Sequence, residues 1–451
     1  MRSVIQCFFT LSCIGFAALS GNGQDNQPMA RATKKDISFR RHSTVITAVA
    51  YSPDGQRIAS AGRYEVKVTD LASGKVLFTV KRSKEMSFAA VAYAPDGKTL
   101  AVAEVRQKAG KTQRRGGLTI TTTFIYGDVL LCDAQTGAVK AKLNDDDNPA
   151  WALAFSPDGR WLSQASGPTP DERECKGMCA AHGEVLLWDV TTGTVAQRMR
   201  GNAAAIQSVA FSPDGRWVAG GGSELQSKDS TQPDSGDPLE AFVWDAATGA
   251  LAQTLKGHRT SITGLAFSPD GRWLATAARD RSLKLWNTQT WQPVKESSDY
   301  LISYDELVRA SEQGKAKNPK KNLPPQSWLN AVAFTRDSRF VVGGGGDALV
   351  RLYAVETGKM LQYLKPKDWP VVSVEHYTPM LEPRISRPGM GGMPTADAAG
   401  PAMMGGGLGR FMLNFPWPYY FGGLNAMAVS PDGKMLALGL ADGKVCLVAL
   451  E

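Results

Sequence analysis

The chain has 451 residues and carries 51 Lys and Arg against 43 Asp and Glu. The formal charge of +8 is mild for this length, so it favours acidic partners slightly and does not indicate nucleic-acid binding. After residue 20 no apolar run approaches the ~20 residues of a membrane-spanning helix, so we expect no transmembrane span in the mature chain.

The first 20 residues predict a secretory signal peptide. Met1-Arg2 is a short positive start, Val4 to Leu19 is mostly apolar, and Ala18-Leu19-Ser20 is a plausible cleavage context. The alternatives are an uncleaved anchor, for which the run is short, and lipid attachment at Cys13, whose context only loosely resembles a lipoprotein signal. Residues 21–35 are polar and predict a disordered linker. We therefore expect a secreted or periplasmic protein.

A tight turn recurs along the rest of the chain. In the copy at 268–271, Pro269 presets φ for the first turn position and Gly271 can adopt a positive φ. The residues before it alternate between apolar and small or polar, which predicts a half-buried strand. Five further copies and one altered copy, at 335–338, give seven turns in all; the five stand at 52–55, 94–97, 156–159, 212–215 and 430–433.

Each turn precedes a third-strand signature, and five of these signatures lead into a second tight turn that ends in Gly, at 72–74, 135–137, 191–193, 247–249 and 356–358. Repeats of roughly 40–45 residues with four short strands predict the blades of a propeller. We therefore expect an all-β, seven-bladed β-propeller of four-stranded antiparallel blades over residues 36–451.

The two ends of this region are predicted to share one blade. His42 precedes its turn at Ser52 by the same interval as His258 precedes the turn at Ser268. Residues 36–42 therefore correspond to an outer fourth strand, and none follows the third strand of the seventh copy. An N-terminal strand that completes the last blade would close the ring and cover a sheet edge.

The chain resembles the WD-repeat β-propeller family over about 36–451, through Leu187-Trp188-Asp189, Val243-Trp244-Asp245 and Gly257-His258. Blades of this family often contain a relay of His, Ser or Thr, Asp and Trp, and the resemblance implies a structural role for it. Only the fifth blade matches it fully, at His258, Thr276, Asp280 and Trp286. Fragments stand at His42, Ser60, Asp347 and Asp442.

Seven blades need roughly 290 residues, so the region holds long insertions, at 104–128, 166–183, 223–240, 298–327 and 366–423. They fall between second and third strands, or between an outer strand and the next blade. Both kinds of connection emerge on one face of a propeller, here called the loop face; the seven tight turns define the opposite turn face. Loops on a rigid scaffold usually carry binding residues, so we expect partners on the loop face.

Two basic stretches and an aromatic run are the candidates for partner binding. Basic residues beside aromatic side chains suit an acidic protein surface or an anionic envelope polymer. The alternative is that these loops only pack over the channel mouth. The candidates are Arg106, Arg114, Arg115, Lys317, Lys320, Lys321, Trp417, Tyr419, Tyr420 and Phe421.

Six cysteines give little reason to expect a metal. Cys175 and Cys179 share one insertion and predict a local disulfide in an exported protein. The alternatives are two thiols, or a site with His182 whose spacing fits no common zinc pattern. Cys132 and Cys446 lie in third strands and predict buried small hydrophobes. We expect no cofactor and no metal.

The sequence contains no nucleophile elbow, phosphate-binding loop, dinucleotide fingerprint or metalloprotease helix motif. The resemblance implies a non-enzymatic protein–protein interaction scaffold, which the predicted signal places outside the cytoplasm and the insertions direct toward the loop face. The alternative is a propeller enzyme, or a cofactor- or metal-binding protein, that uses the channel mouth and the inserted loops.

Overall fold

In the computed structural model every regular element of the described residues is a β-strand. These residues are 37–40, 42–81, 86–115, 118–144, 149–167, 183–201, 205–222, 239–280, 282–294, 329–346, 350–358, 360–364 and 423–450.

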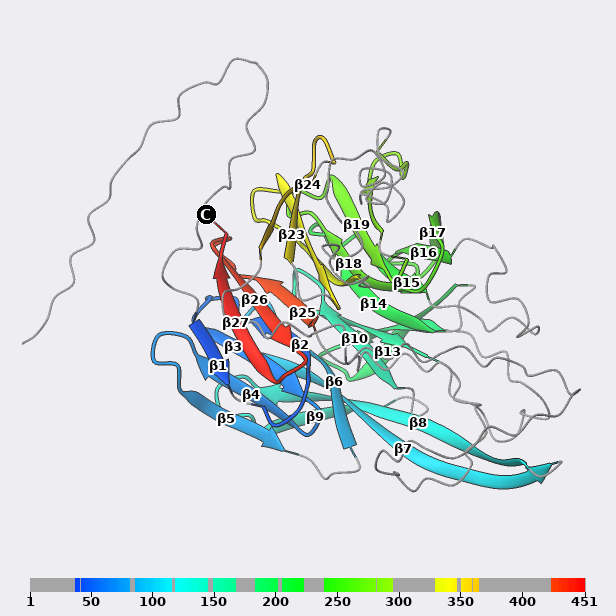
Figure 1. Cartoon of the computed structure of the whole chain (residues 1–451). Helices are drawn as coiled ribbons and strands as arrows, with labels where there is room; N and C mark the ends of the chain where they lie inside the picture. Colours follow the sequence, from blue (N-terminus) through cyan, green and yellow to red (C-terminus); the bar gives the residue numbers. More distant parts are fainter. Residues whose placement is uncertain are drawn as a thin grey trace, which may run out of the picture. The chain divides into compact units, whose positions relative to one another are not determined.

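The strands form seven antiparallel sheets (Figure 1). Neighbouring strands of a sheet are consecutive along the chain, except that β1 lies beside β27 in the last sheet. The first strands are β2 (Ile46–Tyr51), β6 (Met86–Tyr93), β10 (Ala150–Phe155), β14 (Ile206–Phe211), β18 (Ile262–Phe267), β21 (Leu329–Phe334) and β25 (Leu424–Val429). The second are β3 (Arg57–Gly62), β7 (Thr99–Arg115), β11 (Trp161–Ser166), β15 (Trp217–Gly222), β19 (Trp273–Ala278), β22 (Phe340–Gly345) and β26 (Met435–Leu440).

The third strands are β4 (Glu65–Asp70), β8 (Leu118–Asp133), β12 (Glu184–Asp189), β16 (Leu239–Asp245), β20 (Leu283–Asn287), β23 (Val350–Ala354) and β27 (Lys444–Ala449). The outer strands are β5 (Val76–Lys81), β9 (Val139–Leu143), β13 (Thr194–Arg200), β17 (Leu251–His258), β24 (Met360–Leu364) and β1 (Ile37–Arg40). Among the described residues the fifth sheet has three strands, with a single bridge between Trp286 and Pro293 where a fourth would begin.

The sheets close into a ring because each first strand contacts the first strand of the next sheet, and β25 contacts β2. Seven buried clusters fill the seven interfaces. One joins Val68 of the first blade to Leu100 of the second, and another joins Ile46 of the first blade to Leu447 of the seventh. A blade sheet cannot bury both of its faces alone, so this stacking supplies the core. The seven-bladed propeller predicted from the repeats is confirmed.

Polar side chains on the first strands also cross between blades. Thr47 donates to the Phe88 carbonyl at 3.0 Å, Thr263 to Leu329 at 2.6 Å, and Asn330 to Leu424 at 2.9 Å. Asn425 of the last blade donates to the Ile46 carbonyl of the first at 3.2 Å. The ring therefore closes through hydrogen bonds as well as apolar contact.

The N-terminal strand completes the last blade, as the spacing of His42 predicted. β1 pairs antiparallel with β27, from Ile37 opposite Leu447 to Arg40 opposite Lys444. Just after β1, the His42 N–H donates to the Gly443 carbonyl at 3.2 Å.

The second blade differs from expectation. The insertion at 104–128 was expected to be a basic loop, but β7 and β8 continue through it and remain paired as far as Arg115 opposite Leu118. β6 leaves β7 after Arg106, and β9 pairs with β8 only from Val129 onward. The insertion is therefore a two-stranded ribbon that extends beyond its blade (Figure 1).

Candidate functional site

The turn face is built from seven similar turns. In the first, the Gly55 N–H donates to the Ser52 carbonyl at 2.8 Å, and the Ser52 hydroxyl donates to Asp54 at 2.5 Å. This hydrogen bond and one from the Gln56 N–H hold the pKa of Asp54 below its usual range. The aspartate thus accepts hydrogen bonds from donors in its own turn and stabilises the turn, as Asp side chains do in such turns.

Neighbouring turns touch around the whole ring. Five prolines pack over the turn glycine of the following blade: Pro431 on Gly55, Pro53 on Gly97, Pro95 on Gly159, Pro157 on Gly215 and Pro213 on Gly271. At the altered sixth turn, the Asp270 N–H donates to the Ser338 hydroxyl at 3.0 Å, and Arg336 packs over Gly433. The turn face is therefore one continuous set of short contacts.

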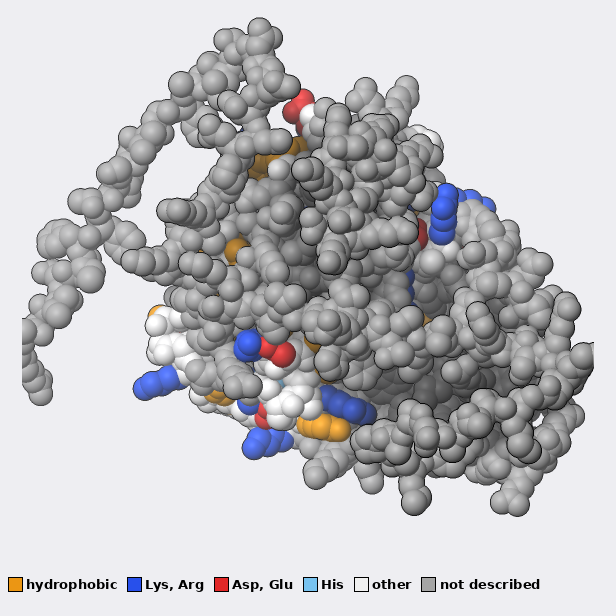
Figure 2. Space-filling view, in the orientation of Figure 1, with side chains coloured by type: hydrophobic (Ala, Val, Ile, Leu, Met, Phe, Trp, Pro, Cys, Tyr) orange, Lys and Arg blue, Asp and Glu red, His pale blue; other side chains and the backbone are white. Residues whose placement is uncertain are grey.

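Charges on the turn face are mixed. Exposed cations follow six of the turns, and each lies two residues after the turn aspartate; they are Lys98, Arg160, Arg216, Arg272, Arg339 and Lys434. Arg160 and Arg216 each stack on the next Trp, with 4.5 Å from the guanidinium carbon to the ring centre. Basic and acidic side chains are likewise interspersed on the described surface seen in Figure 2. The described part of the turn face therefore does not form a patch of a single charge sign.

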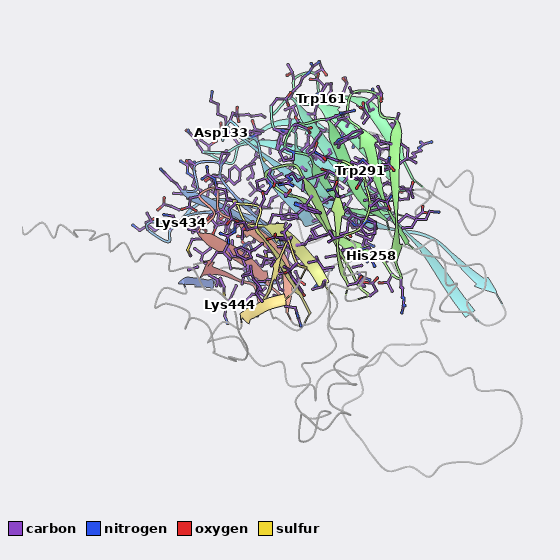
Figure 3. The ribbon with its side chains drawn as sticks, turned by 90° about the horizontal axis from the view of Figure 1, so that it is seen from above. Asp133, Trp161, His258, Trp291, Lys434 and Lys444 are labelled. Atoms are coloured by element: carbon purple, nitrogen blue, oxygen red, sulfur yellow. The ribbon has the colours of Figure 1, made fainter. Side chains whose placement is uncertain are left out.

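The loop face lies at the other end of the strands. In Figure 3, Trp161 and Lys434, next to tight turns, lie toward one side, whereas His258 and Lys444 lie toward the other, where the ribbon leaves the blade. Three other long connections also start from this end, between β11 and β12, β15 and β16, and β24 and β25. β20 ends beside the turn at 268–271, where the Thr288 N–H donates to the Arg272 carbonyl at 3.0 Å, so the connection from β20 to β21 reaches this end only at Leu329.

An acidic residue anchors the base of the ribbon. The buried carboxylate of Asp128 accepts from Lys142 at 2.9 Å and Asn144, and the Arg106 guanidinium lies 3.7 Å away. Arg106, predicted to bind a partner, is therefore placed beside Asp128 at the point where the ribbon begins.

Ion pairs recur at the same end of the neighbouring third strands. Glu184 accepts from Arg198 and Arg200, each at 3.0 Å, and Lys256 lies 3.1 Å from Glu240. In the first blade Glu65 pairs with Lys67 at 2.6 Å. The sequence reasoning missed this set; its signal was an acidic residue at or just before each of these third-strand signatures.

The four relay residues of the fifth blade form one hydrogen-bonded chain. Trp286 Nε1 donates to Thr276 Oγ1 at 3.0 Å, and this hydroxyl lies 2.7 Å from His258 Nε2. His258 Nδ1 lies 3.1 Å from Asp280, which also accepts from the Arg259 N–H and from Ser282. Burial alone would raise the pKa of Asp280, but the hydrogen bonds from His258, Ser282 and Arg259 lower it to about 2.

This relay links two blades. His258 ends β17 of the fourth blade, whereas Thr276, Asp280 and Trp286 belong to the fifth. His258 and Thr276 are fully buried. These side chains therefore interact with one another across a blade interface.

A shorter version joins the seventh blade to the first. His42, which follows β1, has Nε2 2.8 Å from Ser60 Oγ on β3, and Glu65 lies 3.6 Å from Nδ1. Burial and then the nearby Lys67 charge lower the pKa of His42 to about 4, against an opposing contribution from Glu65. His42 is thus a neutral imidazole at the closing interface.

The other predicted site residues are divided between the ribbon and the undescribed residues. Arg114 and Arg115 lie on β7, opposite Thr119 and Leu118. Outside the described residues are Cys175, Cys179, Lys317, Lys320, Lys321, Trp417, Tyr419, Tyr420 and Phe421. The residues predicted to form the signal peptide and the linker lie there too. Cys132 and Cys446 are both buried in apolar clusters, as predicted.

Within the described ranges, no three His, Cys, Asp or Glu side chains gather as a metal site would require. The same part of the chain holds no helix long and apolar enough to cross a membrane.

Comparison with known proteins identifies the repeats. The family model described as "WD domain, G-beta repeat" matches residues 34–70, 193–231 and 249–287. The last match includes Thr276, Asp280 and Trp286, and the first includes the His42 segment. The match thus falls on blades whose strands and turns are described above.

Several curated proteins are similar to the chain. Protein HIR1 of Candida albicans is 32% identical over 311 residues, which is 65% of this chain and 27% of that protein. Periodic tryptophan protein 2 homolog of Caenorhabditis elegans is 22% identical over 244 residues, 48% of this chain and 26% of that protein. COMPASS component SWD3 of Saccharomyces cerevisiae is 23% identical over 225 residues, 49% of this chain and 53% of that protein. The matched regions span between about a quarter and about half of these relatives.

Proposed function

Because the chain belongs to the WD-repeat β-propellers, we propose that it is a non-enzymatic scaffold that binds protein partners through its loop face. The relatives support the general role, since one is named as a component of a complex. The described polar side chains of the blades support the non-enzymatic part of the proposal, because those of the relay and of the ion pairs bind other side chains of the blades.

The observation that carries the proposal is the difference between the two faces. On the turn face the blades meet through short turns that touch one another. The ribbon and three other long connections leave from the opposite end of the strands, and a fourth, from β20 to β21, ends there. A propeller needs only short connections to close, so the additional chain on the loop face is available for recognition.

Capture of partners from an extract of the source cells tests this proposal. In a ribbon-shortened variant, Asn-Gly replaces residues 107–125 and joins Arg106 to Tyr126, which already face each other in the ladder. Two residues of this type form a tight hairpin turn. The matched control is the double variant Lys98→Glu, Lys434→Glu on the turn face. We expect the ribbon-shortened protein to lose partners that the control retains, while both melt like the unaltered protein. The reverse pattern would place binding on the turn face.

We further propose that the protein works outside the cytoplasm, with residues 1–20 as a cleaved signal. The motive is the positive start, the apolar run and the small residues near Ser20. Terminal sequencing of the protein purified from its source should find a first residue close to Gly21 in a secreted or envelope fraction. A cytosolic protein that retains Met1 would contradict it.

A further inference from the structure

Resting on the scaffold role, we propose that the outer edge of β8 in the ribbon accepts an extended, acidic segment of a partner protein as an additional strand. The site is the backbone of residues 118–125. Binding at this part of the loop face would occur by strand addition, and the bound segment would be extended and acidic.

The ribbon has two edges without a neighbouring strand among the described elements. β6 pairs with β7 only as far as Arg106, which leaves residues 107–115 of β7 at one edge. β9 pairs with β8 only from Val129, and Lys142 and Asn144 still contact Asp128, which leaves residues 118–125 at the other. A ribbon of two strands is only marginally stable in water, so a third strand would stabilise it.

The two edges are unequal. β7 carries Lys108 and Lys111, and its register shifts between Ala109 and Thr112, around Gly110. Lysines and bulges are the usual means by which proteins keep an edge from pairing. The β7 edge is therefore protected against strand addition.

The β8 edge has none of these features. From Leu118 to Gly127 it contains no charged residue and no proline, and six of its residues are the β-branched Thr or Ile. The extra residue of the bulge is on β7, so β8 itself runs without interruption. An uncharged, regular, β-branched edge is the kind that pairs with another strand, and its backbone groups would supply the affinity.

Charge selects the occupant. Residues 107–125 include Lys108, Lys111, Arg114 and Arg115 and no acidic residue. A strand added to β8 would lie two strand spacings from β7, about 10 Å, which is close to the screening length at physiological salt. Acidic side chains on the added strand would thus be attracted, whereas a second copy of this ribbon would be repelled.

Hydrogen exchange of the full chain with a synthetic peptide tests this. The probe is a ten-residue peptide of alternating Glu and Val, and the controls are a poly-Glu peptide of equal charge and a 20-base-pair DNA duplex. We expect the alternating peptide to slow amide exchange within residues 118–125 and to bind at least tenfold more tightly than poly-Glu. Equal binding of poly-Glu would reduce the site to a basic patch, and tighter binding of DNA would assign it to nucleic acid; either result overturns the proposal.

A pair of proline variants separates the edge from the ladder. Successive N–H groups of a strand point to opposite sides, so of T119P and I120P one removes an outward donor and the other removes a donor to β7. The outward variant should keep the β7–β8 exchange protection of the free protein and lose at least tenfold in peptide affinity. R114Q with R115Q should weaken binding and its salt dependence. Unchanged affinity in both proline variants would overturn the proposal, as would sedimentation showing that the unaltered chain dimerises through the ribbon.

Cell-extract capture distinguishes this proposal from the scaffold role. If the ribbon-shortened protein loses partners but the outward proline variant keeps them, strand addition is wrong and the scaffold stands. If the unaltered protein captures no partner at all, the scaffold role fails, whatever the peptide does.

Discussion

At the scale of single residues, His42 couples ring closure to pH. Its pKa is about 4 in the folded protein and 6.5 without perturbation, because burial and then Lys67 disfavour the imidazolium. The unfolded chain therefore binds the proton more readily. The stabilisation from the neutral imidazole is complete above about pH 6.5 and is lost as the pH falls toward 4.

The difference between the folded and the unperturbed pKa of His42 corresponds to at most roughly 3 kcal/mol in the free energy of unfolding. We expect the free energy of unfolding of the unaltered protein to fall by about this much more, between pH 7 and pH 4, than that of H42Q. Urea titrations at several pH values measure the difference. Both proteins contain the same aspartates, whose contributions to the pH dependence of unfolding cancel in the comparison. Parallel pH profiles would show that His42 is not the titrating group.

Trp291 is a second residue with an unusual role. It occupies the position where five other blades have the glycine of the second turn, and its φ of 55° is rare for a residue with a side chain. Its indole is buried and meets Trp217 edge-on, with ring centres 5.9 Å apart. The packing therefore holds a strained backbone in place.

W291G separates these two effects. Glycine removes about 1 kcal/mol of backbone strain, but loss of a buried aromatic side chain costs about 3–5 kcal/mol. We expect a net destabilisation of about 2–4 kcal/mol in urea unfolding. As a control, G249A introduces a side chain at the equivalent turn of the fourth blade and should cost about 1 kcal/mol. A more stable W291G would show that strain outweighs packing.

At the scale of elements, β1 is expected to contribute far more than its four residues suggest. It covers the β27 edge, and the His42 contacts to Gly443 and Ser60 follow it. Deletion of residues 21–42, with the leader retained, should lower the melting temperature by about 10 °C. Deletion of 21–35 alone should leave it unchanged. Equal melting of both variants would mean that the ring does not depend on this strand.

The strands could be predicted because each blade repeats the same local chemistry. Turns such as 268–271 contain their own φ preferences and capping side chains, so their geometry is readable without the rest of the chain. The ribbon could not be recognised in this way. Gly110, Gly116 and Gly117 within residues 104–128 are typical of a loop. The strands that form there have 16 and 17 residues, far more than the strands of the other blades, so the repeat pattern did not predict them.

Interactions between blades were harder to predict than the blades themselves. The relay of His258 could be named from the family pattern, although the blade boundary that it crosses appears only in the structure. Ion pairs within a blade were also hard to predict, because Lys142 beside Asp128 and Arg200 beside Glu184 come from the next strand and their contacts depend on register. Register depends on the turns and on packing, which is why the acidic set was missed.

At the scale of the whole molecule, the closed ring should unfold as one unit. Cys132 lies in the second blade and Cys446 in the seventh, both buried. We expect both thiols to become reactive at the same urea concentration in the unaltered protein, when labelling is read by peptide mass. In the 21–42 deletion, Cys446, which faces Ser38 of β1, should react well before Cys132. Separate midpoints in the unaltered protein would indicate independent blades.

The pairing of β1 with β27 also fixes an order in time. Ile37 is among the first propeller residues to leave the ribosome, and its partner Leu447 is among the last. At about 5–20 residues per second, the delay between them is on the order of twenty seconds to more than a minute. Throughout synthesis the growing chain is an open arc with an exposed blade at each end, so a chaperone that shields such ends during translation would protect it until the last strand is made.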